Sequence, residues 1–282
     1  MSAPLSEPTL HQTPTQVAED TYVIHEVQHA LGQPLSVYIN SAVILADEPI
    51  LVDTGSLRNR RGWLEDAFAL VAPEDVRWVF ISHEDADHVG NLEQVMDQCP
   101  RATLICNWAL IERHTNAFDF PLDRCRWLDE GSFFDAGDRR MSVVRPPLYD
   151  SPTTRGLLDS KTGVLWAVDA FATPVPGGLG ATSTAAYVSD LDGDFWAHGM
   201  TMFAHNALAP WLRLVDRQRF SEEVQRTADL GVSTIISAHS PAIAGGDIEQ
   251  ALTLMRELPD AECPPAPDQA VLELILSATQ SF

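Results

Sequence analysis

The chain has 282 residues, 45% of them hydrophobic and 21% charged, and its formal net charge is -22. This length and composition are typical of a globular protein with a sizeable core. The negative charge argues against binding to a nucleic-acid backbone or to an anionic membrane, because both are polyanions. No apolar run approaches the ~18 residues of a membrane span, and the N-terminus lacks the basic and apolar regions of a signal peptide.

Residues 1–20 are rich in Pro, Thr and Ser, and we expect them to form a flexible N-terminal arm. Residues 21–282 are expected to form a single domain. The four cysteines form no CxxC pair and lack the regular spacing of a disulfide-linked scaffold. This is typical of reduced thiols and predicts a cytoplasmic protein.

Apolar strands and helices alternate along the first half of the chain. The patterns predict strands over 22–27, 37–55 (two strands around a turn at 46–49), 76–82 and 102–107, and helices over 60–71, 91–98 and 108–115.

The second half begins with short strands and glycine turns over 125–147 and a hairpin over 156–172. A Gly/Pro/Thr-rich loop over 174–185 follows. Helices are predicted over 194–214, 220–230, 248–258 and 270–279, with a late strand over 232–239. Strand–helix order in both halves favours an α/β fold with two sheets flanked by helices.

Residues 81–91, ISHEDADHVGN, concentrate metal-binding side chains: His83, Asp85, Asp87 and His88 lie within six residues. So many charged groups would repel one another unless they are solvated or hold a metal ion. A solvated acidic turn is the alternative. Ligand-type residues also follow three other apolar strands, at Asp53, Asp169 and His239, and strand ends are where function tends to lie. Any one of them alone could be a capping residue.

The segment SHEDADH (82–88) resembles the metallo-β-lactamase superfamily signature, T/S-H-x-H-x-D-H. The resemblance runs over about residues 22–242 and includes VDTG (52–55), LDEGSFFDAGD (128–138), VDAF (168–171) and SAHSP (237–241). It implies a metallo-β-lactamase-like αβ/βα sandwich. A carboxylate at position 85 is similar to the flavodiiron branch and its oxygen-binding diiron relatives, H-x-E-x-D-H. Asp150, Ser151 and Pro152 and the eighteen residues between Asp150 and Asp169 are similar to that branch as well.

The resemblance implies two metal sites. His83, Asp85 and Asp150 would hold one ion, Asp87, His88 and His239 the other, and Asp169 would bridge them. The first set departs from the branch twice, since Asp85 is one methylene shorter than Glu and Asp150 replaces a histidine. An empty first site is therefore an alternative, and so is ligation by Tyr149. The resemblance also places His205 near the pocket, where it could donate a hydrogen bond; a capping histidine is the alternative.

Charge favours iron over zinc at such a centre. Four aspartates balance two divalent ions, whereas a residual positive charge is what activates water in zinc hydrolases. Carboxylates also prefer harder ions such as iron or manganese. The leading hypothesis is thus a dinuclear non-haem iron protein that binds or activates dioxygen.

Two alternatives stay open: a zinc- or manganese-dependent hydrolase of an ester, lactone or phosphoester, and a degenerate member with one or no metal that acts as a binding module. The expected partners are a small molecule (dioxygen or a small organic substrate), a separate electron-donor protein and a second copy in a homodimer. Nucleic acid and membrane are not expected.

Overall fold

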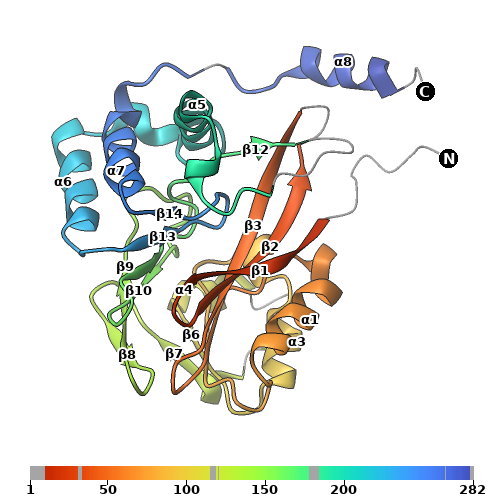
Figure 1. Ribbon diagram of the computed structural model, residues 1–282, viewed down its shortest axis with the longest axis vertical. Helices are drawn as coiled ribbons and strands as arrows, with labels where there is room; N and C mark the ends of the chain where they lie inside the picture. Colours follow the sequence, from red (N-terminus) through yellow and green to blue (C-terminus); the bar gives the residue numbers. More distant parts are fainter. Residues whose placement is uncertain are drawn as a thin grey trace.

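The structure is a computed structural model that describes residues 10–30, 34–114, 119, 121–177, 184–263 and 265–279. Two β-sheets pack face to face, and helices cover the outer face of each (Figure 1). This layering is the metallo-β-lactamase-like αβ/βα sandwich, so the predicted fold class is confirmed.

The first sheet has the strand order β1-β2-β3-β4-β5-β6-β7, and β12 pairs with β3. Strands β1 to β4 are antiparallel, whereas β4 to β7 run parallel. The strands are β1 Leu10–Ala18, β2 Thr21–His29, β3 Leu35–Ile44, β4 Ile50–Val52, β5 Trp78–Phe80, β6 Thr103–Cys106, β7 Cys125–Trp127 and β12 Val175–Pro176.

The second sheet has the order β14-β13-β11-β10-β9-β8. Its β11 and β13 are parallel neighbours although about seventy residues separate them in the chain. The strands are β8 Phe133–Asp135, β9 Arg140–Val144, β10 Gly156–Asp159, β11 Val164–Trp166, β13 Thr234–Ile236 and β14 Ile243–Ala244.

Helices α1 Arg60–Leu70, α3 Leu92–Gln98 and α4 Trp108–His114 cover the first sheet, and α5 Gly193–Phe203, α6 Arg217–Ala228 and α7 Asp247–Glu257 cover the second. The short α2 Ala86–Val89 follows β5, and α8 Gln269–Thr279 extends away from both layers (Figure 1). Short helical turns complete the chain: η1 Leu57–Asn59, η2 Leu122–Arg124, η3 Val188–Asp190, η4 Ala204–Leu208, η5 Pro210–Leu214 and η6 Leu258–Asp260. In the part of the chain that the structure describes, no helix is both long and apolar enough to cross a membrane.

Strands buried on both faces explain the continuous apolar runs of the sequence. In β4, Leu51 belongs to the cluster beneath the first helical layer, whereas Ile50 and Val52 belong to the core between the sheets. In β13, Ile235 and Ile236 divide in the same way between the second helical layer and the inter-sheet core. Alternate side chains point to opposite faces of a strand, so both faces of such a strand must be apolar.

Two expected elements differ in the structure. Residues 10–18 of the expected arm form β1, an edge strand paired with β2, because their backbone groups find partners on Thr21–His29; residues 1–9 lie outside the described residues. The helix expected over 194–214 ends at Phe203 and continues as a π-helical turn and a 3-10 turn, since Pro210 cannot donate the next helical hydrogen bond. Of the expected loop over 174–185, residues 178–183 are outside the described part of the chain.

Among the described residues, no disulfide bond joins the cysteines. Burial raises the pKa of Cys99 and of Cys106 to about 12. Both thiols therefore stay protonated and unreactive near neutral pH.

A buried arginine ties the two sheets together at the end where β4 begins. Arg139, with its side chain 0% exposed, donates to Asp159 at 3.0 Å, to Asp138 at 2.8 Å and to both carboxylate oxygens of Asp20. Asp20 lies in the β1–β2 turn of the first sheet, whereas Asp138 lies in the β8–β9 turn and Asp159 ends strand β10 of the second. The cluster thus closes the sandwich by charge-assisted hydrogen bonds rather than by apolar packing.

This cluster predicts a loss of stability in acid. Hydrogen bonds from Arg139 hold the pKa of Asp20 and of Asp138 below the usual value. Since both folded-state pKa values lie below the unfolded value of about 3.9, the stabilisation is present above that pH and is lost as the pH falls below it. We expect Asp138→Asn to lose less stability than wild type between pH 5.5 and pH 3.0, measured as urea midpoints. The exposed Asp135→Asn should behave as wild type, and an equal loss in all three proteins would contradict the assignment.

Candidate metal centre

The predicted ligands gather at one edge of the sandwich because parallel strands end there. His83 follows β5, Asp169 follows β11 and His239 follows β13. Because parallel neighbours place their carboxyl ends side by side, residues far apart in sequence meet at this edge.

Asp169 lies at the centre of the set. Its Oδ2 is 3.4 Å from His83 Nε2, whereas its Oδ1 is 3.2 Å from His88 Nε2 and 3.2 Å from His239 Nε2. The two oxygens of one carboxylate therefore face two different groups of nitrogen atoms. A carboxylate in this position is suited to bridge two ions.

Carboxylates complete each group. On one side, His83 Nε2 is 3.6 Å from Asp85 Oδ2 and 3.9 Å from Asp150 Oδ1. On the other, Asp87 Oδ2 is 3.7 Å from His88 Nε2 and 3.5 Å from His239 Nε2. Ligands bound at about 2.1 Å to one ion lie roughly 3.0–3.5 Å apart. Both groups are thus compact enough to hold an ion, and the structure brings all seven predicted ligands together.

The two groups differ in exposure. The Asp85 side chain is 54% exposed and Asp150 25%, while His88 is 2% and His239 12% exposed. The first group therefore has one buried histidine and two carboxylates open to solvent. In the second group both histidines are largely shielded from solvent. This is also the group in which Asp87 and His88 match the H-x-E-x-D-H pattern without a substitution.

Buried polar atoms in the set lack partners. His83 Nε2 and Asp169 Oδ1 are both buried, and although other ligand atoms lie 3.2–3.6 Å away, neither makes a hydrogen bond of normal geometry among the described residues. Leaving such groups unsatisfied is unfavourable, and a bound ion is one of the few remedies. On this observation the residues fit a metal centre.

The histidine rings are held with Nε2 toward the centre. His88 Nδ1 lies 2.8 Å from Asp53 Oδ2, and His239 Nδ1 lies 2.8 Å from the backbone carbonyl oxygen of Tyr38. Donation from Nδ1 leaves the Nε2 lone pair free to bind metal, as in other histidine-ligated sites. The second group is thus oriented before any ion arrives.

Asp53 is a positioning residue, a role that its place after a strand did not reveal. It is fully buried and accepts hydrogen bonds from the Ser82 backbone N–H and the Ser82 hydroxyl, both at 2.7 Å, as well as facing His88. Its φ of 56° directs the side chain back beneath the motif. Aspartate tolerates this left-handed conformation better than most residues.

We expect Asp53→Asn to weaken metal binding by about 10–100-fold, since outer partners of ligating histidines contribute that much. The amide keeps the shape and the backbone tolerance but removes the carboxylate that His88 faces. Competition with a fluorescent chelator measures the effect, and Asp135→Asn, an exposed carboxylate, is the control. Unchanged affinity in Asp53→Asn would contradict the role.

Glu84 is a second residue that the motif did not single out. It accepts hydrogen bonds from Ser151 Oγ at 3.1 Å and from Thr153 Oγ1, and it pairs with Arg113. These contacts tie the loop that carries Asp150 to the segment that carries His83. The only available sequence clue is that Glu84 adds a fifth charged residue to residues 83–88.

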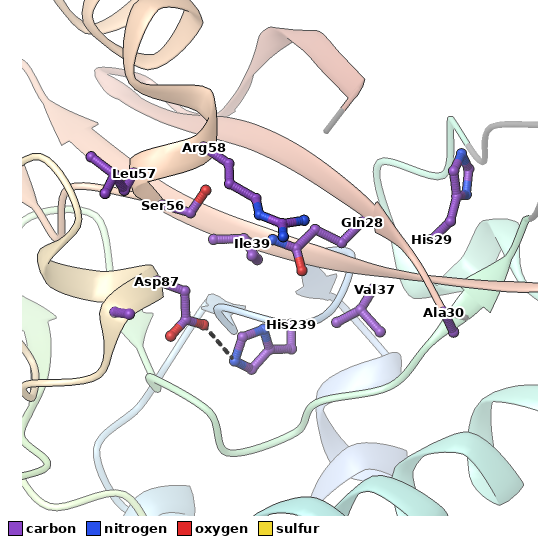
Figure 2. Close-up of a pocket in the computed structure, with 11 residues that line it drawn as sticks. Gln28, His29, Ala30, Val37, Ile39, Ser56, Leu57, Arg58, Asp87 and His239 are labelled. Carbon is purple, nitrogen blue, oxygen red and sulfur yellow. Dashed lines mark ion pairs between the residues drawn. The ribbon is translucent and has the colours of Figure 1, made fainter. Parts of the chain in front are cut away.

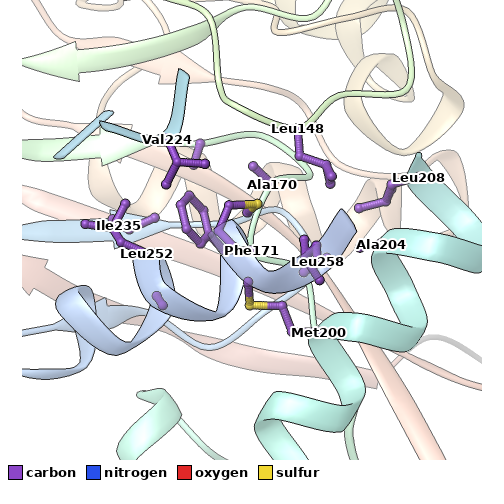
Figure 3. Close-up of a cluster of buried hydrophobic side chains, with 14 of the residues drawn as sticks. Leu148, Ala170, Phe171, Met200, Ala204, Leu208, Val224, Ile235, Leu252 and Leu258 are labelled. Carbon is purple, nitrogen blue, oxygen red and sulfur yellow. The ribbon is translucent and has the colours of Figure 1, made fainter. Parts of the chain in front are cut away.

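The loop around Asp169 is strained and anchored from both sides. Val168 has a φ of 57° and Phe171 of 65°, conformations that cost roughly 1–3 kcal/mol each for such residues. Val168 is buried in the inter-sheet core and Phe171 in the outer one, where it packs near Met200 and Leu252 (Figure 3). The burial of Val168 on one side of the loop and of Phe171 on the other therefore fixes the Asp169 carboxylate between the two ligand groups.

Charges in the set shift one another's protonation. Burial would lower the pKa of His88, but Asp87, Asp53 and Asp169 outweigh it and raise the pKa well above the usual value. Burial would raise the pKa of Asp169, yet the neighbouring histidines hold it well below its usual range. The surrounding carboxylates thus favour the protonated form of His88, and an ion that binds His88 competes with that proton.

Asp150 behaves differently from Asp169. Burial and the negative charge of Asp169 raise the pKa of Asp150. Because a carboxylate binds an ion in its deprotonated form, the raised pKa of Asp150 makes metal binding by the first group more sensitive to acid than an unperturbed aspartate would.

The other sequence candidates lie outside the set. His205 Nε2 donates to the Leu258 carbonyl oxygen at 2.8 Å, which ties η4 to η6, and Phe203 rather than His205 stacks on His239. The structure does not bring His205 together with the seven ligands by any described contact, so its part in the chemistry stays a prediction. Tyr149 packs against Trp211 while Asp150 joins the set, so the alternative register of this loop is not adopted.

Two arginines near Asp150 pair with acidic residues. Arg145 Nε lies 3.2 Å from Glu130 and Arg155 Nε lies 2.5 Å from Asp129. Neither pair involves a predicted ligand.

An αβ/βα sandwich with histidines and carboxylates converging at one edge is the arrangement of the metallo-β-lactamase fold. The chain belongs to the family described as ODP family beta lactamase, whose model matches residues 37–224.

Known proteins are similar over most of the chain. "Putative diflavin flavoprotein A 2" of Nostoc sp. is 25% identical over 209 residues, which is 72% of this chain and 33% of that protein. The chain thus spans about a third of the length of the first curated relatives it matches.

Solved structures share the fold. The flavodiiron protein from Giardia intestinalis superposes with a TM-score of 0.70 at 18% identity, over 88% of this chain and 59% of that chain. Rubredoxin oxygen:oxidoreductase from Desulfovibrio gigas gives 0.74 at 14% identity, over 88% and 62%. Both resemblances support the architecture that the sheets define.

Proposed function

We propose that the chain is a dinuclear non-haem iron protein that binds or activates dioxygen. The observation that carries the proposal is the division of the Asp169 oxygens between two groups of ligands. Two iron ions would be held by His83, Asp85 and Asp150 on one side and by Asp87, His88 and His239 on the other. Bound there, iron would supply reversible one-electron chemistry.

The balance of charge supports iron over zinc. The four aspartates of the set offset two divalent ions, which leaves little excess positive charge to activate water for hydrolysis. Oxygen ligands also favour iron or manganese over softer ions. Two proteins of similar fold, a flavodiiron protein and a rubredoxin oxygen:oxidoreductase, have names consistent with this choice.

This chain's own residues would orient and shield the centre. Asp53 and the Tyr38 carbonyl hold the rings of His88 and His239, and Glu84 holds the Asp150 loop. A separate protein would supply electrons for any turnover, and we keep the homodimer and the cytoplasmic location as parts of the proposal.

The test is elemental analysis of protein expressed with iron, zinc and manganese all available, together with absorbance spectra in air and after anaerobic reduction. We expect about two irons per chain, from the two ligand groups, and an absorbance that changes with oxygen. Two zinc ions and no colour would overturn the proposal in favour of a hydrolase of an ester, lactone or phosphoester. One metal or none would overturn it in favour of a binding module whose first group is empty.

A further inference from the structure

A pocket opens beside the second ligand group. Its volume is about 610 Å³, and Asp87 and His239 lie on its floor. Figure 2 shows these two side chains facing each other below the pocket, with strands β2 and β3 and the segment after β4 forming the walls.

The pocket is far larger than a diatomic gas requires. Small organic ligands occupy clefts of roughly 300–1,000 Å³ with mostly apolar walls. Apolar side chains supply much of the lining here, from Val37, Ile39, Leu57 and Ala86. Size and lining therefore indicate an organic molecule rather than a gas alone.

Arg58 is the cationic group in the lining. Figure 2 shows its side chain extending past Ile39 toward Gln28, across the pocket from Asp87 and His239. Among the described residues, Arg58 makes no hydrogen bond or ion pair, although the chain has 40 acidic and 18 basic residues. Some arginines pair with an acidic side chain, for example Arg61, Arg113 and Arg145, and others, such as Arg60 and Arg124, donate to an amide or to backbone carbonyl groups. The Arg58 side chain is exposed to solvent and to the pocket.

Neighbouring polar groups are already engaged. The Ser56 hydroxyl and the Gln28 amide both donate to Glu26, a buried carboxylate behind the wall. The guanidinium of Arg58 thus remains as the group suited to an anion, and its planar fork matches a carboxylate.

We propose that this pocket binds a small organic carboxylate, with its charged end on Arg58 and its apolar body against Val37, Ile39 and Leu57. The inference rests on the proposed function, in that the adjacent metal centre would act on the bound molecule. In a protein of net charge -22, an anion needs a local cation to bind. The ligand set, balanced by its own carboxylates, offers an anion little further attraction.

The test uses benzoate and its uncharged analogue benzamide as probes, titrated by calorimetry into the metal-loaded protein. We expect benzoate to bind wild type about tenfold more tightly than benzamide, the factor for about 1.4 kcal/mol. Arg58→Gln should remove that difference while the metal content stays that of wild type. Arg61→Gln is the matched control, because it deletes the same charge three residues away on an exposed side chain that pairs with Glu65.

Equal binding of the two probes to wild type would overturn the inference. So would benzoate binding that survives in Arg58→Gln, because the anion would then lie on the metal, and so would an equal loss in Arg61→Gln. These readouts do not depend on which metal is present. If the protein holds zinc but binds benzoate through Arg58, the pocket is upheld and the proposed function fails. If the protein holds two irons but its benzoate binding does not depend on Arg58, the proposed function stands and the pocket is rejected.

Discussion

Asp169→Asn is expected to lose metal from both groups at once. Its two oxygens face His83 on one side and His88 and His239 on the other, so the amide removes a negative charge from both ion positions. Metal content, measured after gel filtration, should fall from about two ions per chain to below one, since carboxylate charge is what favours hard ions.

Variants of single groups provide the comparison. His83→Ala should lose one ion and His239→Ala the other, because the first histidine belongs to the group with Asp85 and Asp150 and the second to the group with Asp87. Asp135→Asn, an exposed carboxylate, should keep the wild-type content. Full metal content in Asp169→Asn would contradict the bridging position.

Arg139→Leu is expected to lower the free energy of unfolding by about 3–5 kcal/mol, the usual effect of breaking a buried ion cluster from one side. The change leaves Asp159, whose side chain is 0% exposed, without its cation, and it leaves Asp20 and Asp138 with Lys161 as their remaining cation. Denaturant unfolding of the metal-loaded protein measures the loss.

The neighbouring residue is the control. Arg140 is 55% exposed on its side chain and lies 3.6 Å from Asp135. An exposed pair of this kind contributes about 0–1 kcal/mol, so Arg140→Leu should change stability little. Because the cluster lies at the opposite end from the metal ligands, Arg139→Leu should keep its metal while folded. Similar losses in the two variants would contradict the structural role of Arg139.

Local features were predictable from the chain alone. The strand over 22–27 and the helix over 60–71 appear as β2 and α1, because apolar spacing fixes which face each element buries. The metal-binding character of His83, Asp85, Asp87 and His88 was equally evident, since these four residues lie within six positions of one another in the sequence. The N-terminal strand was missed because β1 is polar and gains its stability from pairing with β2 rather than from its own pattern.

Asp53 and Glu84 show what local pattern cannot supply. Both were visible in the sequence as charged residues near apolar strands, but their partners, Ser82 and His88 for one and Ser151 and Thr153 for the other, depend on how loops cross. Nothing in the sequence distinguishes Arg58 from other arginines, and it becomes a candidate anion-binding group only because β2 and β3 wall a pocket beside it.

The sequence by itself determined the central strands, most of the helices and the chemical type of the ligands, because these depend on neighbours within a few residues. Only the tertiary structure decided that Asp169 faces two groups, that Arg139 joins turns more than a hundred residues apart, and that a pocket opens over His239. Such contacts arise when the two sheets pack together, and their distances depend on the packing of the whole core rather than on any one segment.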